Sequence, residues 1–269
     1  MDFSKNIKKI IKLILPKKIF NLILMIYQSI KYKSYKYLFY KVSNDKEINE
    51  KNLINISINK EKIIFNLKNF DLDYNDPKLS WHYHLFAGLS DNKKNLCILE
   101  IGTHLGKLTN FISQFFKSSE IYTIDLDQKD ELFINSYNRK DEIYMDNFLK
   151  ERSINLNKKN IKFIEMNSLD LLSNFEKNKF DIIWLDGDHT NPQVSMDVLS
   201  AYHLLKKNGI LMTDDLFFDQ NSRGSHLSQG LQPLKYLTDI KKLKTFYFVK
   251  RVIRRNAFAK KFISFSIKI

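Results

Sequence analysis

The sequence predicts an α/β fold in which an open, mostly parallel β-sheet is covered by helices on both faces. Short apolar runs that suit buried parallel strands recur from residue 96 onward, with helical patterns between them. A turn with two glycines separates the first apolar run from the helix after it. Acidic or hydroxyl side chains stand directly after several of the runs. This alternation is typical of a doubly wound sheet that binds a ligand at one edge.

Residues 96–127 contain the first strand, turn, helix and second strand of this pattern. Gly102 and Gly106 mark the turn, where a Cβ would block positive φ angles or the close approach of a ligand. Their spacing, Glu-x-Gly-x-x-x-Gly, departs from the Gly-x-Gly-x-x-Gly that cradles a pyrophosphate, so a phosphate-poor nucleoside ligand fits better. Asp125 ends the second strand, where a carboxylate can accept hydrogen bonds from both ribose hydroxyls.

The elements after this stretch continue the alternation. Lysines followed by Asn208 and Gly209 are typical of a helix C-terminus, and two strand-like segments joined by a basic turn end the chain. We therefore expect a helical region over 128–156, strands over 161–166, 180–186 and 210–213, helices over 193–205 and 233–243, a polar loop over 216–232, and closing strands over 246–249 and 262–267.

Ligands of open α/β sheets bind at the carboxyl ends of the strands. Each predicted strand in the central part of the chain ends beside a glycine, a carboxylate or a hydroxyl group. We therefore expect five positions to converge on one edge of the sheet, namely Gly102, Asp125, Ser168, Asp186 and Asp214.

With these glycines and acids in place, residues 80–269 resemble the class I, Rossmann-like methyltransferases that depend on S-adenosyl-L-methionine (SAM). The resemblance implies a doubly wound, mostly parallel seven-stranded sheet, closed by an antiparallel pair and preceded here by an N-terminal helical extension. It implies SAM as the cofactor, with adenine near the end of the third strand. The residues that it implies for SAM binding are Glu100, Gly102, Thr103, Gly106, Asp125, Asn167, Ser168 and Asp186. For Asn167 and Ser168, the equal alternative is that Ser168 and Asp170 only cap the loop before Leu171.

The segments WLDGDHT and NGILMTDDL resemble a second signature, that of metal-dependent small-molecule O-methyltransferases of the catechol and caffeoyl-coenzyme A types. The resemblance places Asp186, Asp214 and Asp215 around a divalent cation, for which oxygen ligands favour Mg²⁺. His189 stands where those enzymes carry a lysine that takes the acceptor proton, and imidazole can do so without a large pKa shift. The alternative, that Asp188 and His189 only cap the following turn, stays open.

The net charge of +14 is concentrated at the two ends of the chain. Residues 1–41 carry +9 and residues 241–269 carry +10, which leaves residues 42–240 at −5. The central body is therefore mildly acidic, and we expect no nucleic-acid partner. The single cysteine, Cys97, excludes an internal disulfide and is expected in the core. No Cys/His cluster indicates zinc.

Residues 1–41 are the basic part of an extension predicted over 1–79, before the catalytic domain at 80–269. Their apolar run of about a dozen residues after Pro16 is shorter than the roughly 20 needed to cross a bilayer. No small-residue cleavage site follows it, so a signal peptide is not expected. Two interpretations remain: helices lying on an anionic membrane surface, or a helical cap on the domain or on a second copy in a homodimer. We expect a cytoplasmic protein, peripheral on the inner membrane surface in the first case.

Two further segments precede the first strand. Residues 43–79 are rich in Asn, Lys and Asp and are predicted to be a connecting segment with a hairpin over 53–67. Residues 80–90 are aromatic and rich in histidine, so they either close over the cofactor or cover the sheet. We favour the second, because aromatic residues before a first strand are commonly core.

Together these features predict SAM-dependent methyl transfer to a hydroxyl or amine of a small-molecule acceptor, such as a sugar or secondary metabolite, assisted by Mg²⁺. An NAD-dependent oxidoreductase is the first alternative, and the spacing of the glycine turn argues against it. A non-catalytic, membrane-associated SAM-binding protein of the same fold is the second. Turnover on an acceptor distinguishes it from the enzyme.

Overall fold

The computed structural model describes residues 45–269, apart from 92–93, 219–229 and 251–260, together with four helical positions nearer the N-terminus. It contains a seven-stranded sheet of order β3-β2-β1-β4-β5-β7-β6, in which β1 to β5 are parallel and β7 is antiparallel to both neighbours. This confirms the predicted doubly wound, mostly parallel sheet with an antiparallel closing pair. The strands are β1 (Cys97–Ile101), β2 (Glu120–Asp125), β3 (Ile161–Glu165), β4 (Phe180–Leu185), β5 (Leu205–Leu216), β6 (Leu243–Val249) and β7 (Phe262–Lys268).

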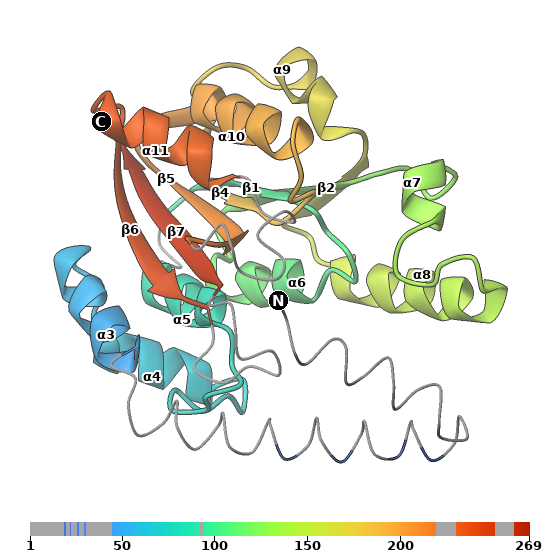
Figure 1. Ribbon diagram of the computed structural model, residues 1–269, viewed down its shortest axis with the longest axis horizontal. Helices are drawn as coiled ribbons and strands as arrows, with labels where there is room; N and C mark the ends of the chain where they lie inside the picture. Colours follow the sequence, from blue (N-terminus) through green and yellow to red (C-terminus); the bar gives the residue numbers. More distant parts are fainter. Residues whose placement is uncertain are drawn as a thin grey trace.

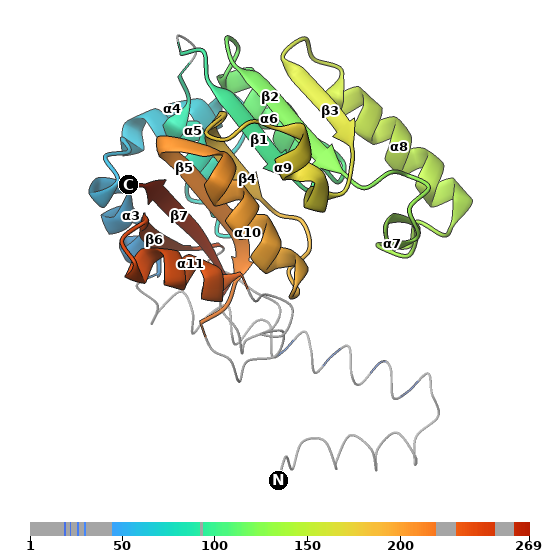
Figure 2. The ribbon, with the colours of Figure 1, turned by 90° about the horizontal axis from the view of Figure 1, so that it is seen from above.

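Helices cover both faces of this sheet, as Figures 1 and 2 show, with α9, α10 and α11 on one face and α5 and α6 on the other. The helical region expected over 128–156 is confirmed as α7 and α8. The helices are α3 (Asp45–Asn55), α4 (Lys60–Lys68), α5 (Trp81–Leu89), α6 (Lys107–Phe115), α7 (Glu131–Ile134), α8 (Glu142–Leu156), α9 (Leu171–Asn174), α10 (Gln193–Leu204) and α11 (Leu231–Asp239), with a 3₁₀ turn η1 (Ser168–Asp170).

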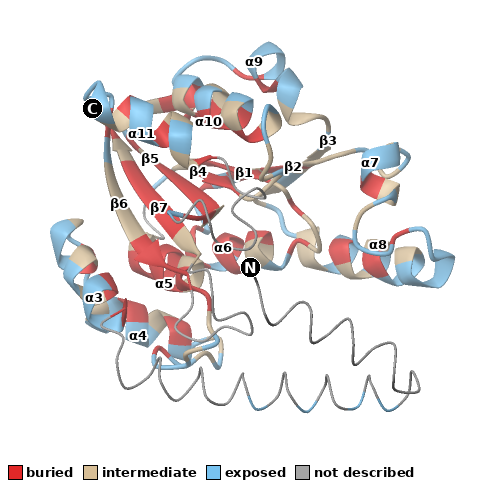
Figure 3. Ribbon diagram, in the orientation of Figure 1, coloured by how far each residue is buried: buried red, intermediate tan, exposed pale blue. Residues whose placement is uncertain are grey.

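The central strands are buried on both faces (Figure 3). Along β4, Trp184 faces the core that contains α5 and α6, whereas Ile183 and Leu185 face the core that contains α10. Successive side chains of a strand point to opposite faces, so a strand between two helical layers must be apolar at every position. The apolar run over 182–185, which follows the partly exposed Asp181, has that cause.

The predicted hairpin over 53–67 is wrong, because this segment forms the end of α3 and most of α4. Asn59 caps α4 by accepting a hydrogen bond from the Lys62 backbone N–H at 2.8 Å. Ile63 and Leu67, four residues apart on one helix face, are fully buried beside α5. The apolar islands therefore had helical spacing, and residues from 45 onward share a core with the sheet.

Helix α5 occupies the aromatic segment before β1, and its Trp81, Leu85 and Phe86 are buried in the core beneath the sheet. The segment covers the sheet, as favoured above. The basic segment 1–41, apart from four positions, lies outside the described residues, as do most of the loop predicted over 216–232 and the turn between β6 and β7. Within the described part of the chain, no helix combines the length and the apolar character needed to cross a membrane.

Candidate active site

The turn after β1 requires both of its glycines. Gly102 has φ +99°, and a Cβ there would lie 2.4 Å from the carbonyl oxygen of Asp186. Gly106 has φ +69° and is the N-cap of α6. The Asp186 backbone N–H donates to the Ile101 carbonyl at 2.9 Å, so the ends of β1 and β4 lie together. The predicted convergence of Gly102 and Asp186 is thus seen directly.

Glu100 lies beneath this turn. Its carboxylate is 1% exposed and accepts hydrogen bonds from the hydroxyls of Thr109 and Thr123, the latter at 2.6 Å. Thr103 reaches the same Thr123 hydroxyl at 2.6 Å. Burial raises the pKa of Glu100 to about 8. Glu100 and Thr103 therefore tie the turn to α6 and β2 from below, and their predicted contact with SAM stays a prediction.

Asp125, at the end of β2, is held by two backbone groups. Its Oδ2 accepts from the His104 N–H at 2.8 Å and its Oδ1 from the Leu126 N–H at 2.9 Å. Each carboxylate oxygen has about two acceptor positions, so one remains on each for a ligand hydroxyl. Burial raises the pKa of Asp125. This arrangement is chemically suited to a ribose diol.

Two buried arginines beside Asp125 were not predicted. The Arg139 guanidinium lies 3.8 Å from the ring centroid of Phe133 and 4.4 Å from that of Phe148, while Arg152 approaches Glu165 at 3.4 Å. Both arginines are 5% exposed. Their charges lower the pKa of Asp125 against the effect of burial. A signal was present, because residues 42–240 contain only three arginines among many lysines.

Asn167 and Ser168, after β3, make local contacts. The Asn167 side chain accepts from the Leu169 N–H at 3.0 Å and caps η1. The Ser168 hydroxyl accepts from the Gln193 amide at 2.7 Å, which joins the end of β3 to α10. Asn167 therefore caps the following turn, whereas Ser168 binds α10 and the Asp170 side chain accepts no cap hydrogen bond. The contact of Asn167 and Ser168 with adenine stays a prediction.

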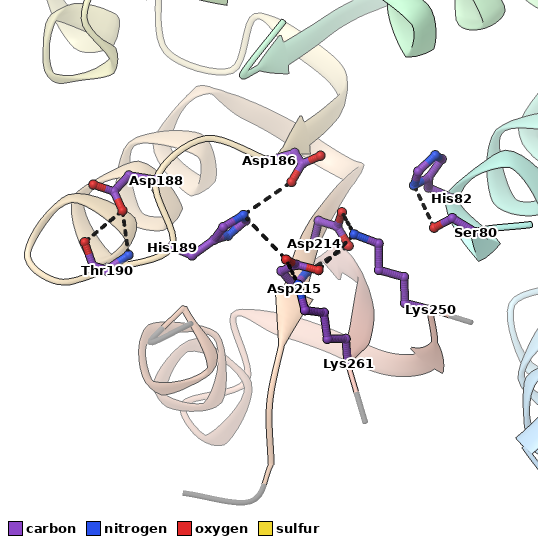
Figure 4. A network of polar contacts seen from close by, with 10 residues as sticks. All are labelled: Ser80, His82, Asp186, Asp188, His189, Thr190, Asp214, Asp215, Lys250 and Lys261. Atoms are coloured by element: carbon purple, nitrogen blue, oxygen red, sulfur yellow. Dashed lines mark hydrogen bonds and ion pairs between the residues drawn. The ribbon is translucent and has the colours of Figure 1, made fainter. Parts of the chain in front are cut away.

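His189 points at the carboxylates of Asp186 and Asp215, and the turn that follows it is capped by Asp188 (Figure 4). Asp188 accepts from both the backbone N–H and the hydroxyl of Thr190 at 2.8 Å. His189 Nε2 lies 3.5 Å from Asp186 Oδ1 and 3.9 Å from Asp215 Oδ2. Burial lowers the pKa of His189, but Asp186 and Asp215 outweigh it and raise the pKa above its ordinary value. His189 is therefore placed to exchange a proton at this edge.

Asp214 and Asp215 both turn toward one lysine, although they are consecutive in β5. The pairing of β5 with β7 shifts register between Thr213 and Leu216, and Asp215 has φ +54°. Lys250 Nζ lies 2.8 Å from Asp215 Oδ1 and closer still to Asp214 Oδ2. Lys261, just before β7, contacts the other oxygen of Asp215 (Figure 4).

These contacts set the charges of the cluster. Burial and the charge of Asp186 raise the pKa of Asp214 to about 7. Burial opposes the charged form of Asp215, but Lys250 and Lys261 outweigh it and lower its pKa. Burial lowers the pKa of Lys250, but the negative charges of Asp214 and Asp215 outweigh this effect and raise the pKa above its ordinary value. Lys250 is therefore a cation and cannot act as a base.

The predicted Mg²⁺ ligands do not fit a divalent cation in this arrangement. Oxygens of Asp214 and Asp215 already face two ammonium groups, which would repel a metal ion placed between them. Within the described ranges, no group of three His, Cys, Asp or Glu residues has the geometry of a metal site. The sequence prediction missed Lys250 and Lys261, for which the available signal was a lysine beside each closing strand.

Comparisons with known proteins give one family match. Residues 99–216 match a family described as a methyltransferase domain. No curated protein matches the sequence. Similar solved structures include a candidate O-methyltransferase from Klebsiella pneumoniae (14% identity, 84% of this chain and 100% of that one, TM-score 0.49). Another is the O-methyltransferase TomG from Streptomyces achromogenes, solved with SAM (15% identity, 85% of this chain and 100% of that one, TM-score 0.47). A third is a SAM-dependent methyltransferase from Aquifex aeolicus (12% identity, 72% of this chain and 90% of that one, TM-score 0.43).

Proposed function

Taking the methyltransferase domain matched over residues 99–216 as the premise, we propose that this protein transfers the methyl group of SAM to a hydroxyl group of a small molecule. The observation that carries the proposal is that this single match spans the glycine turn, the acid that ends β2 and the acid pair of β5. All three lie at the carboxyl ends of the parallel strands. The same match gives no support to an NAD-dependent oxidoreductase.

SAM, when bound, supplies an electrophilic methyl group on a sulfonium centre. The backbone at Gly102 lets the ligand approach the turn, and Asp125 accepts hydrogen bonds from the ribose hydroxyls. The acceptor hydroxyl would lie on the side of Asp186 and His189, and its oxygen would take the methyl group as the sulfur–methyl bond breaks and the neutral thioether leaves. His189 takes the hydroxyl proton on its ring, with Asp186 stabilising the charge that results. Alignment and proton removal are the main demands of this reaction.

A screen of turnover tests the proposal. Purified protein is incubated with SAM and separate sets of sugars, catechols and amino sugars, and formation of the demethylated product is measured. We expect turnover with a hydroxyl acceptor and a loss of about 10²- to 10⁴-fold in His189→Ala, the usual contribution of a general base. His203→Ala, on the far part of α10, serves as the matched control. Binding of SAM without turnover on any acceptor would favour the non-catalytic alternative, and no SAM binding would refute both.

For the N-terminal segment we propose contact with an anionic membrane surface. Ile19, Leu22, Ile26 and Ile30 are spaced three or four residues apart on a helix, and each is about half exposed, at 47 to 60%. The ten lysines of residues 1–41 would each add about 1 kcal/mol near such a surface, screened by salt. The full-length chain should sediment with anionic vesicles at low salt and be released at high salt. A chain that ignores vesicles, and becomes insoluble without the segment, would instead indicate a cap.

A further inference from the structure

The cation at the acid cluster is a side chain of the protein itself. Asp214 is fully shielded from solvent and Lys250 nearly so, with side-chain exposures of 0% and 11%. A buried carboxylate pair needs a compensating positive charge, and an unpaired buried charge costs several kcal/mol. Lys250 supplies that charge to both members of the pair.

The position of Lys250 is fixed by its backbone. It directly follows β6, its N–H donates to the Lys261 carbonyl at 2.9 Å, and its own carbonyl accepts from the Trp81 N–H at 2.8 Å. The ladder between β6 and β7 and the first residue of α5 therefore place its Cα. The side chain extends from there to the acid pair, between the end of β5 and α5 (Figure 4).

Two features of β5 complete the arrangement. In a regular strand, Asp214 and Asp215 would point to opposite faces of the sheet. The register shift and the left-handed conformation of Asp215 bring both carboxylates to the same ammonium group. Aspartate is one of the few residues other than glycine that adopt this conformation as a single residue. The strand is thus shaped around Lys250.

We propose that the Lys250 ammonium group takes the position of the divalent metal expected from the second signature, so that acceptor binding depends on an internal lysine. This rests on the proposed function. Asp214 and Asp215 accept two of its three N–H groups, and the third donates to the acceptor oxygen. A metal chelates two neighbouring oxygens, whereas one N–H binds a single oxygen. The acceptor class is therefore a lone hydroxyl group, in preference to a catechol.

Binding of Mn²⁺ tests this directly, because it needs neither SAM nor an acceptor. Mn²⁺ is titrated into the full-length wild type, Lys250→Met, and the control Lys206→Met, with binding read by electron spin resonance and the unfolding temperature measured in parallel. Lys206 pairs with Asp181 at the opposite end of β4, at 2.8 Å. We expect Lys250→Met to bind Mn²⁺ at least about tenfold more tightly than wild type and to regain unfolding temperature with it, since the freed carboxylates become metal ligands. Lys206→Met should behave as wild type.

Two results would overturn the inference. Wild type that binds Mn²⁺ at a site lost in Asp214→Asn would mean that a metal displaces the lysine. A folded Lys250→Met that gains no Mn²⁺ affinity would mean that the lysine does not hold a metal position. The wild-type titration tests the inference even if Lys250→Met fails to fold. Calorimetry of SAM binding to wild type, run beside it, tests the proposed function separately.

Discussion

The proposed ligand site at the carboxyl ends of the strands has two halves that are built by different means. We name them the cofactor half and the acceptor half after the proposed function. The cofactor half, around Gly102 and Asp125, is set by backbone: positive φ angles, close approach of main chain, and N–H groups that hold the acid. The acceptor half, around Asp214 and Lys250, is set by buried charged side chains that stand on β5 and directly after β6. Backbone geometry tolerates almost no substitution, whereas ion pairs can be exchanged for other charge arrangements. We therefore expect substitutions to be tolerated less well in the cofactor half than in the acceptor half.

The contrast between the two halves predicts the largest effect of a substitution at Gly102. Gly102→Ala should weaken SAM binding more than about a hundredfold, about 2.7 kcal/mol, because the new Cβ would meet a backbone oxygen 2.4 Å away in a left-handed conformation. Gly187→Ala is the matched control in the neighbouring loop, since its Cβ would meet nothing closer than 3.5 Å. Calorimetry measures both. Equal SAM affinity in the two variants would contradict the assignment of backbone control to this half.

A smaller loss is expected at Asp125. Asp125→Ala should reduce SAM affinity by about ten- to a hundredfold, about 1.5 to 3 kcal/mol, through loss of two charge-assisted hydrogen bonds. Asp127→Ala, on the exposed turn that follows, should bind SAM normally. A loss that is identical with a ribose-free sulfonium ligand would show that Asp125 does not contact the sugar.

Glu100 gives a pH dependence of stability. Its folded pKa, about 8, lies above the ordinary value of 4.5, so unfolding releases its proton, and stability falls as pH rises between these values. Denaturant unfolding should show a decline of up to about 1.4 kcal/mol per pH unit for this group. Glu100→Gln should lose that slope, because the amide cannot ionise. Parallel pH profiles for the two proteins would show that the buried carboxyl is ionised in the folded state.

The smallest effect is expected at Lys261. Its substitution distinguishes the role of Lys261 from that of Lys250 in the acceptor half. Its side chain is 33% exposed and contacts only Asp215 among the described carboxylates, so solvent screens the pair. Lys261→Met should change the free energy of unfolding by no more than about 1 kcal/mol and should create no Mn²⁺ site. A larger change than in Lys250→Met would reverse the roles given to the two lysines.

The same contrast explains how far the sequence could be interpreted. The glycine turn, Asp125 and the apolar strands were predicted because each depends on residues a few positions apart, and the family match supports the resemblance that they carry. Lys250 was missed because its contact with Asp214 depends on the β6–β7 pairing and on the register shift in β5, which spacing does not encode. The helices at 45–68 were missed because most of their residues are polar, so the few apolar residues on each buried face gave a weak helical pattern.

Helix α3 has a consequence for the free edge of the sheet. Strand β6 is an edge strand, whose unpaired backbone groups could add a strand from another chain and start aggregation. The Asn49 amide donates to the Val249 carbonyl at 3.0 Å and accepts from its N–H at 2.8 Å, as a neighbouring strand would, and Asn52 binds the Tyr247 carbonyl at 2.9 Å. These amides occupy the edge that strand addition would use. A truncated chain that begins at residue 80 would lose this cover, so a shortened protein made for crystallisation or assay should retain α3.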